Sequence, residues 1–417
     1  MFSSSLLFVG QVLGMVAAFL SYLLVARLLG AQDFGRFMFL YSVFTYIGMF
    51  FEAGTSIATG RLLALSNDQS EQQQLVGTWL ALFGGLAATY CATLLLSVFW
   101  IDRVFQFHVG RTLAFCSLPA IGLPWQNALR EILQGLGAHL RLCFLLVAPW
   151  SFFLLGLSAL KLSGQFSLFS VALLLTASFF LTGLVISITL KPKLPRQGMR
   201  GSPVWNETKR FGVHAFVGRL MGTGTYQLDT PLIAFFVRDP ASVGFYGLAK
   251  GMTAPIALLT WSMGVASYRK LANVRRLSRE TIWLGTLLLL TACLGMGLLG
   301  KPIVLGLLSK GYSGVLPLLY LWIGVAFIQG SYQFPNIFLS ARGEGVILRT
   351  MAIWFSIANL ILNFSLIPLW GTIGATIASG SAYLLWLTLC IFYYSRVTGA
   401  EGKPLNIEPT LQMTIER

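Results

Sequence analysis

The sequence predicts an all-α polytopic membrane protein with about twelve transmembrane helices. Of its 417 residues, 56% are hydrophobic and only 10% are charged, and the mean hydropathy is +0.75. Soluble domains carry roughly a quarter charged residues. A helix needs about 20 mostly apolar residues to cross the hydrocarbon core, and this chain supplies such segments one after another. No soluble fold could bury so much apolar surface.

The apolar segments have short polar breaks between them, so each can be assigned to one helix. The first follows the N-terminus without a basic stretch, and we expect it to be retained as a span. Segment 211–236 contains Arg219 and Asp229, which suits a span that faces a polar interior. The predicted spans are 6–29, 34–58, 74–100, 112–129, 142–160, 167–190, 211–236, 242–266, 281–300, 313–339, 346–367 and 371–395.

The basic residues predict the orientation of these spans. One set of alternate loops, together with the C-terminal tail, holds 19 of the Lys and Arg residues, and the opposite loops hold 8. Cytoplasmic loops carry the excess of Lys and Arg in multispanning proteins. We therefore expect an inner-membrane protein with both termini in the cytoplasm.

A polar, basic stretch near the midpoint predicts two lobes. Residues 191–210 contain Lys, Arg and Pro and too little apolar surface to fold alone, so we interpret them as a cytoplasmic linker. The predicted parts are a six-helix lobe (1–190), the linker, a second six-helix lobe (211–396) and a polar tail (397–417). A short repeat agrees with this division, because Gly35 and Gly244 each open the second span of a half and lie 209 residues apart.

Several classes of function are excluded by what the sequence lacks. The five cysteines and three histidines have no metal-ligand spacing, so we expect no metal. The net charge of +15 comes without a nucleic-acid motif, and the basic residues sit in loops, so we expect no nucleic-acid partner. No long loop carries clustered acids, so we expect no enzyme.

Three stretches resemble the polysaccharide exporters and Wzx-type O-antigen flippases of the multidrug/oligosaccharidyl-lipid/polysaccharide transporter superfamily. They are 26–35 (ARLLGAQDFG), 226–229 (YQLD) with 243–249 (VGFYGLA), and 359–363 (NLILN) with 367–375 (IPLWGTIGA). Their order and spacing together are specific, and the likeness spans nearly the whole chain. Lys250 departs from the pattern, because these families usually have an uncharged residue there.

The resemblance implies two six-helix lobes around a central cavity that opens alternately to each side. It implies a cargo of polyprenyl-pyrophosphate-linked oligosaccharide for O-antigen lipopolysaccharide, capsule or exopolysaccharide, with Na+ or H+ as coupling ion and no other cofactor. Membrane lipids would surround the protein, and a polysaccharide polymerase would be a further partner. A lipid II flippase and a cation-coupled multidrug exporter share this superfamily and remain alternatives, and a membrane-bound glycan-modifying enzyme is a distant one.

Charged residues inside spans are the candidate site residues, because burying a charge in the membrane is costly. We expect Lys250, Arg219 and Arg27 to bind the anionic cargo, since cations can replace the hydration of a pyrophosphate. We expect Asp229 and Glu52 to bind the coupling cation. Structural roles remain alternatives: Arg219 and Arg27 as interfacial anchors, and the two acids as partners of interhelical donors.

Overall fold

The computed structural model describes residues 2–193, 201–220, 224, 227–308 and 310–399. This described part is helical, with short 3-10 and π-helical turns and no strand. The α-helices are α1 (Phe2–Phe50), α2 (Thr55–Leu65), α3 (Gln69–Phe105), α4 (Gly110–Cys116), α5 (Gly122–Gly135), α6 (His139–Leu162), α7 (Leu168–Thr189), α8 (Pro203–Glu207), α9 (Val213–Arg219), α11 (Asp229–Val237), α12 (Pro240–Ala266), α13 (Tyr268–Asn273), α14 (Arg279–Pro302), α15 (Val315–Ser331), α16 (Gln333–Ala341) and α17 (Gly345–Gly399).

The predicted all-α polytopic fold is confirmed. Seven helical stretches of the described chain are long and apolar enough to cross a membrane. Two of them, in α1 and α17, are each divided by a glycine with a positive φ, Gly30 at 77° and Gly371 at 56°. An L-residue with a side chain rarely adopts such an angle. The two glycines therefore mark the predicted turns between neighbouring spans.

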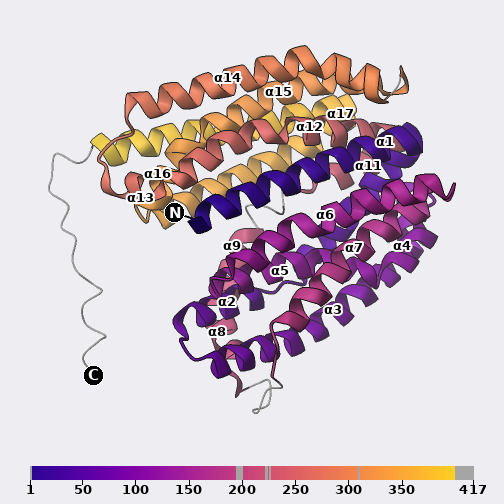
Figure 1. Cartoon of the computed structure of the whole chain (residues 1–417). Coiled ribbons are helices and arrows are strands. Elements are labelled where there is room, and N and C mark those ends of the chain that lie inside the picture. Colours follow the sequence, from indigo (N-terminus) through magenta and orange to yellow (C-terminus); the bar gives the residue numbers. More distant parts are fainter. Residues whose placement is uncertain (1, 194–200, 221–223, 225–226, 309, 400–417) are drawn as a thin grey trace, which may run out of the picture.

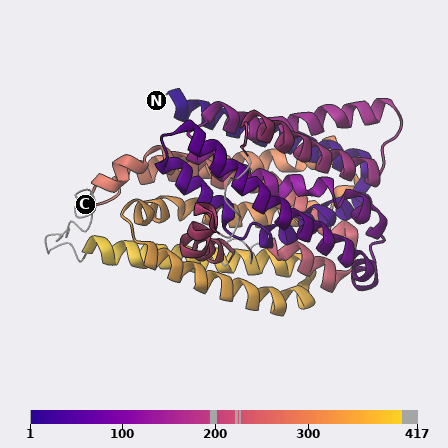
Figure 2. The ribbon, with the colours of Figure 1, turned by 90° about the horizontal axis from the view of Figure 1, so that it is seen from below.

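The helices form two bundles of roughly parallel members (Figure 1). The first contains α1–α7 and the second contains α11–α17, and α1 contacts both α6 of its own bundle and α12 of the second. Helix α1 begins and α17 ends at the same end of the molecule, which both views show (Figure 2). We call this the terminal end. The opposite end, with the turns at Gly30 and Gly371, is the distal end.

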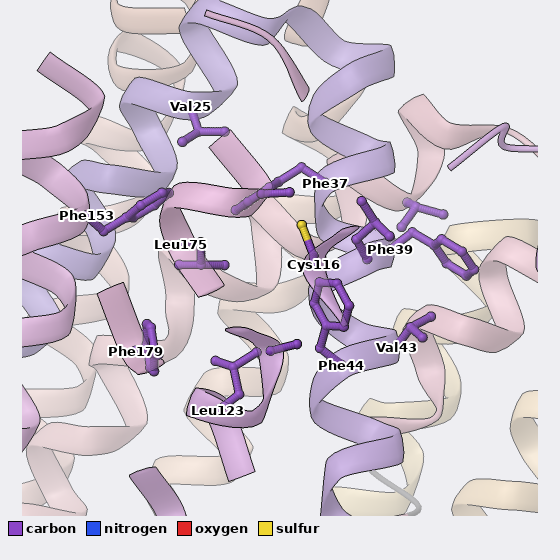
Figure 3. Close-up of a cluster of buried hydrophobic side chains, with 14 of the residues drawn as sticks. Val25, Phe37, Phe39, Val43, Phe44, Cys116, Leu123, Phe153, Leu175 and Phe179 are labelled. Atoms are coloured by element: carbon purple, nitrogen blue, oxygen red, sulfur yellow. The ribbon is translucent and has the colours of Figure 1, made fainter. Parts of the chain in front are cut away.

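The first bundle is held by a continuous apolar core. Aromatic side chains of α1 meet α6 and α7 there: Phe37 stacks on Phe153 with ring centroids 6.3 Å apart and 8° between the ring planes. Figure 3 shows Phe37, Phe153, Leu175 and Phe179 converging on this core. Close packing of this kind, rather than a hydrophobic effect between helices, holds membrane bundles together.

Three predicted spans are interrupted in the described part of the structure. The span expected at 34–58 stops at Phe50 and resumes at Thr55, because Ala53 and Gly54 have positive φ angles. The span at 112–129 is α4 and α5 joined by a 3-10 turn that begins at Pro119. The span at 313–339 divides into α15 and α16 at Tyr332.

The span expected at 211–236 includes residues outside the described part. Helix α9 ends at Arg219 and α11 begins at Asp229, and between them the structure describes residues 220, 224, 227 and 228. Tyr226 of the 226–229 stretch lies outside the described residues.

Part of the predicted linker is helical, which corrects the expectation of a loop without its own structure. Helix α8 and the π-helical turn Thr208–Gly212 follow one another, and Val204 is fully buried. α8 and α9 contact α2 of the first bundle. A Cβ on Gly54 would overlap the carbonyl oxygen of Gly212, so only glycine permits this approach.

The two bundles touch directly at the distal end. A Cβ on Gly35 would overlap the carbonyl oxygen of Pro240, and Gly244 lies against Gly35 in turn. The Gln32 side chain donates a hydrogen bond of 3.2 Å to Asp239. The Tyr312 hydroxyl donates to the carbonyl oxygen of Ala26. The two glycines of the internal repeat thus form one contact, which closes the distal end.

Asp239 makes the stability of this contact depend on pH. It caps α12, accepting from the backbone N–H of Ala241 at 3.2 Å and of Ser242 at 2.9 Å, and from the Ser242 hydroxyl at 2.6 Å. Burial alone would raise the pKa of Asp239, but the hydrogen bonds from Ser242, Gln32 and Ala241 outweigh it and hold the pKa below its ordinary value. A lowered pKa stabilises the fold above the unfolded value of about 3.9, and this stabilisation is lost as the pH falls through the lowered pKa.

We therefore expect Asp239→Asn to lose less stability than the wild type when the pH falls from about 5 to about 3, the range around the ordinary aspartate pKa. Asparagine keeps an acceptor for the cap but cannot be protonated in this range. Thermal unfolding in detergent across this range measures the difference. If the melting temperatures of the two proteins fall equally over this range, the Asp239 carboxylate does not cause the acid sensitivity.

Candidate functional site

Asp229 is a fully buried carboxylate at the centre of a polar cluster in the second bundle. Its side chain is 0% exposed and accepts from the Tyr246 hydroxyl at 2.7 Å, the Asn363 amide at 2.9 Å and the Ser379 hydroxyl at 2.9 Å. The Lys250 ammonium lies 3.4 Å from the same carboxylate. A buried carboxylate is costly unless it is paired and hydrogen-bonded, and this one is both. The predicted coupling acid and the predicted cargo cation are therefore partners.

Three helices bring the cluster together near mid-membrane. Asp229 is the first residue of α11, which has 9 residues and thus reaches about 13 Å to the distal end, roughly half of the hydrocarbon core. Tyr246 and Lys250 are four residues apart on α12, so they share one face. Asn363 and Ser379 come from the two halves of α17 on either side of Gly371.

Several oxygen and nitrogen atoms around Asp229 are buried without a hydrogen-bond partner in the described structure. They are the Asn363 Oδ1, the Asn359 Nδ2 and the Gln227 Oε1. The Asn359 Oδ1 does accept from the Asn363 amide at 3.0 Å. Buried polar atoms nearly always have a hydrogen-bond partner, so we expect water or another small polar species to contact these atoms. Carboxylate and amide oxygens suit a hard cation or water.

Lys250 links this cluster to a cavity between the bundles. The cavity has a volume of about 360 Å³ and lies between α1, α11 and α12. Most of its lining is apolar or aromatic, including Phe19, Tyr22 and Tyr41. Lys250 is the charged residue among the described residues that line it. The side chain of Lys250 is 19% exposed, and its ammonium also lies 5.6 Å from the ring centres of Tyr246 and Trp322.

Arg219 forms a second charged cluster, with two carboxylates of the first bundle. Its guanidinium lies 3.1 Å from the Glu52 carboxylate and also pairs with Glu131 of α5. Glu52 occupies the break between α1 and α2, about 30 Å along α1 from Gly30 and hence near the terminal-end face of the membrane. Two of the predicted site residues, with opposite predicted roles, are thus joined in one ion pair. Glu131 lies inside α5.

We expect Arg219→Met to destabilise the protein by about 3–5 kcal/mol, because it leaves the Glu52 carboxylate, only 5% exposed, without its cation. Adding Glu52→Gln and Glu131→Gln should restore much of the loss. Thermal unfolding of the purified chain in detergent measures both changes.

The matched control is Arg61→Met, which removes the pair between Arg61 and Glu207. Arg61 is 49% exposed, so about 0–1 kcal/mol is expected. Equal losses for Arg219→Met and Arg61→Met would contradict the importance of the Arg219 cluster.

Arg27 lies apart from both clusters. It is exposed on α1 beside the turn at Gly30 and does not line the central cavity. The sequence missed Tyr246, Ser379 and Glu131 as site residues. Tyr246 had a usable signal, because it precedes Lys250 by one helical turn. Ser379 and Glu131 had none, since they reach their partners across 150 and 88 residues.

Comparison with solved structures shows a common fold. A multidrug resistance MATE family transporter of the MOP superfamily, in an inward-facing conformation, superimposes with a TM-score of 0.72 at 16% identity, covering 93% of this chain and 96% of that one. The lipid II flippase MurJ, in an inward closed conformation, gives 0.73 at 14% identity, covering 95% and 90%. An outward-facing MATE family transporter gives 0.59 at 15% identity, covering 95% and 96%.

Comparison with sequences gives the family. No curated protein matches the chain. The family model described as polysaccharide biosynthesis protein matches residues 3–268, well over half of the sequence. The chain therefore belongs to the polysaccharide biosynthesis protein family and has the fold of the MOP superfamily transporters.

Proposed function

We propose that this protein is a flippase that carries a polyprenyl-pyrophosphate-linked oligosaccharide across the inner membrane by alternating access, for the synthesis of O-antigen, capsule or exopolysaccharide. The observation that carries the proposal is Lys250, a cation in the cavity between two bundles of a polysaccharide biosynthesis family member. A cation at mid-membrane can replace the hydration that an anionic group loses on leaving water.

The orientation follows from the charge bias of the loops. The basic loops lie at the terminal end, so that end faces the cytoplasm and the distal end faces outward. The contacts at Gly35, Asp239 and Tyr312 close the outward side. In this state the cavity receives its cargo from the cytoplasm, and opening of the distal contact releases the cargo on the other side.

Asp229 provides the coupling in this proposal. It shares Lys250 with the cavity, and buried amide oxygens lie beside it. A Na+ ion or proton that binds Asp229 weakens its hold on Lys250 and so frees Lys250 for a pyrophosphate oxygen. Binding of the cation and binding of the cargo are then linked, and each strengthens the other.

Arg219, Glu52 and Arg27 have other roles in the proposal. Arg219 and Glu52 are occupied with each other, so they hold the broken helices together near the cytoplasmic face and reach a cargo or cation only after the pair separates. Arg27 anchors the first span at the outer interface. Surrounding lipids and a polysaccharide polymerase are the expected partners, and nucleic acid is not.

Two transporters of other cargo compete with this proposal. A lipid II flippase moves the same pyrophosphate chemistry, and only the sugar part distinguishes it. A multidrug exporter of cationic compounds would favour an acidic cavity, whereas the described lining carries a cation. A glycan-modifying enzyme would need oriented acid–base or metal ligands, which the described cavity lining does not contain.

Deletion of the gene in its host tests the proposal. Undecorated lipid-linked glycan should accumulate in the inner leaflet, and the wild-type gene should restore surface polysaccharide. Normal surface glycan together with increased drug sensitivity would overturn the flippase assignment in favour of a drug exporter.

A further inference from the structure

A second cavity lies inside the second bundle, behind Lys250. Its volume is about 340 Å³, and residues of α12, α15, α16 and α17 line it. Lys250, Ala254 and Leu258 line both this cavity and the central one. The lysine therefore stands at the border between the two spaces. A volume of this size falls at the lower end of small-molecule sites, which measure roughly 300–1,000 Å³.

The lining of this second cavity combines aromatic rings with carboxamides. Trp261, Trp322, Tyr332 and Tyr383 supply the rings, and those of the two tyrosines stack 6.1 Å apart at an interplanar angle of 17°. Gln329 and Gln333 supply the amides, one turn apart across the α15–α16 junction. Each amide offers donors and an acceptor, and both are partly accessible.

This composition fits a sugar. The C–H face of a pyranose is apolar and packs on an aromatic ring, while its hydroxyl groups need both donors and acceptors at the edges. A polyprenyl tail would gain nothing from the two glutamines and would leave their amides without partners. An organic cation would meet Lys250 at the entrance, and like charges repel.

We propose that the second cavity is a glycan subsite, which holds one or two sugar residues of the cargo while the pyrophosphate contacts Lys250. The inference rests on the proposed function and deepens it. It assigns the sugar end of the cargo to the second bundle and the lipid end to the space between the bundles. Gln329 and Gln333 then select among sugars by their hydroxyl pattern, since a site with hydrogen-bonding groups rejects ligands that leave those groups unpaired.

The test measures glycan contact and transport separately. The probe is the repeat-unit glycan released by mild acid from the lipid-linked intermediate that accumulates in the deletion host. Saturation-transfer difference NMR with the purified full chain in detergent reports its contact with protein. Transport is followed with the intact lipid-linked parent in proteoliposomes.

We expect the wild type to contact the glycan and Gln329→Leu/Gln333→Leu to weaken that contact about tenfold, through the loss of two hydrogen bonds. The exposed pair Gln134→Leu/Gln165→Leu is the matched control and should behave as wild type. A weaker contact at an unchanged melting temperature indicates a binding defect, whereas a lower melting temperature indicates misfolding. The single variant Gln333→Leu provides the same comparison with a smaller change to the fold.

The outcomes distinguish the two proposals. If the wild type transports the lipid-linked parent but shows no glycan contact, or if the glutamine variants keep full contact, the subsite is wrong and the flippase proposal stands. If the wild type does not transport the parent, the proposed function is wrong and the subsite falls with it.

Discussion

Replacing Lys250 by methionine is expected to abolish transport of the lipid-linked glycan while the protein still reaches the membrane. Methionine is unbranched and only one heavy atom shorter than lysine, but it removes the charge that lines the cavity. It also leaves the Asp229 carboxylate, 0% exposed, with neutral donors alone. Breaking a buried ion pair costs about 3–5 kcal/mol, so a lower melting temperature should accompany the loss of transport.

A second substitution separates these two effects. Lys250→Met/Asp229→Asn removes both charges and should regain much of the stability, because neither member of this ion pair is left charged without its partner. Transport should stay absent, since the cation for the pyrophosphate is still missing. Lys161→Met, at an exposed lysine in the last turn of α6, is the control and should change neither property. A double variant that transports normally would show that Lys250 serves only the fold.

Adding a single methyl group at Gly35 should hold the distal end open. The new Cβ would overlap the carbonyl oxygen of Pro240, so the bundles can meet there only after the backbone shifts. Overpacking of this kind costs roughly 1–3 kcal/mol. Because the cost applies only to the state with a closed distal end, Gly35→Ala should shift the population towards the outward-open state and slow transport by roughly tenfold.

Cysteine labelling tests this shift. Thr45 lines the central cavity, so Thr45→Cys reports whether a membrane-impermeant maleimide reaches the cavity from outside. Labelling of Thr45→Cys should be greater when Gly35→Ala is also present. The same protein without Thr45→Cys serves as the blank, because it reports labelling of the native cysteines. Gly84→Ala, on α3 where a Cβ meets nothing within 4 Å, is the matched control. Unchanged labelling in Gly35→Ala would contradict a closing role for this contact.

The sequence predicted the helical membrane fold because apolar length and polar breaks are properties of consecutive residues. It also predicted the turns at Gly30 and Gly371 within a few residues. It did not predict the break at Ala53 and Gly54. Apolar windows average over such breaks, and glycine inside a membrane span is common enough to carry little signal.

Four charged residues of the two clusters were identified from the sequence, but their pairing was not. Lys250, Asp229, Glu52 and Arg219 were identified because a charge inside a span is costly wherever it lies. Their partners depend on how distant segments pack: Arg219 reaches Glu52 across 167 residues and Asn363 reaches Asp229 across 134. Hydropathy gives no information on such contacts.

Transport by the purified protein shows whether it moves a lipid-linked glycan or a cationic drug. The protein is reconstituted into liposomes and offered, in separate experiments, the lipid-linked glycan from the deletion host and a small cationic dye, with and without a Na+ or proton gradient. We expect the anionic glycolipid to move only when Lys250 is present, and we expect no movement of the dye. Movement of the dye without movement of the glycolipid would contradict the flippase proposal and identify a drug exporter.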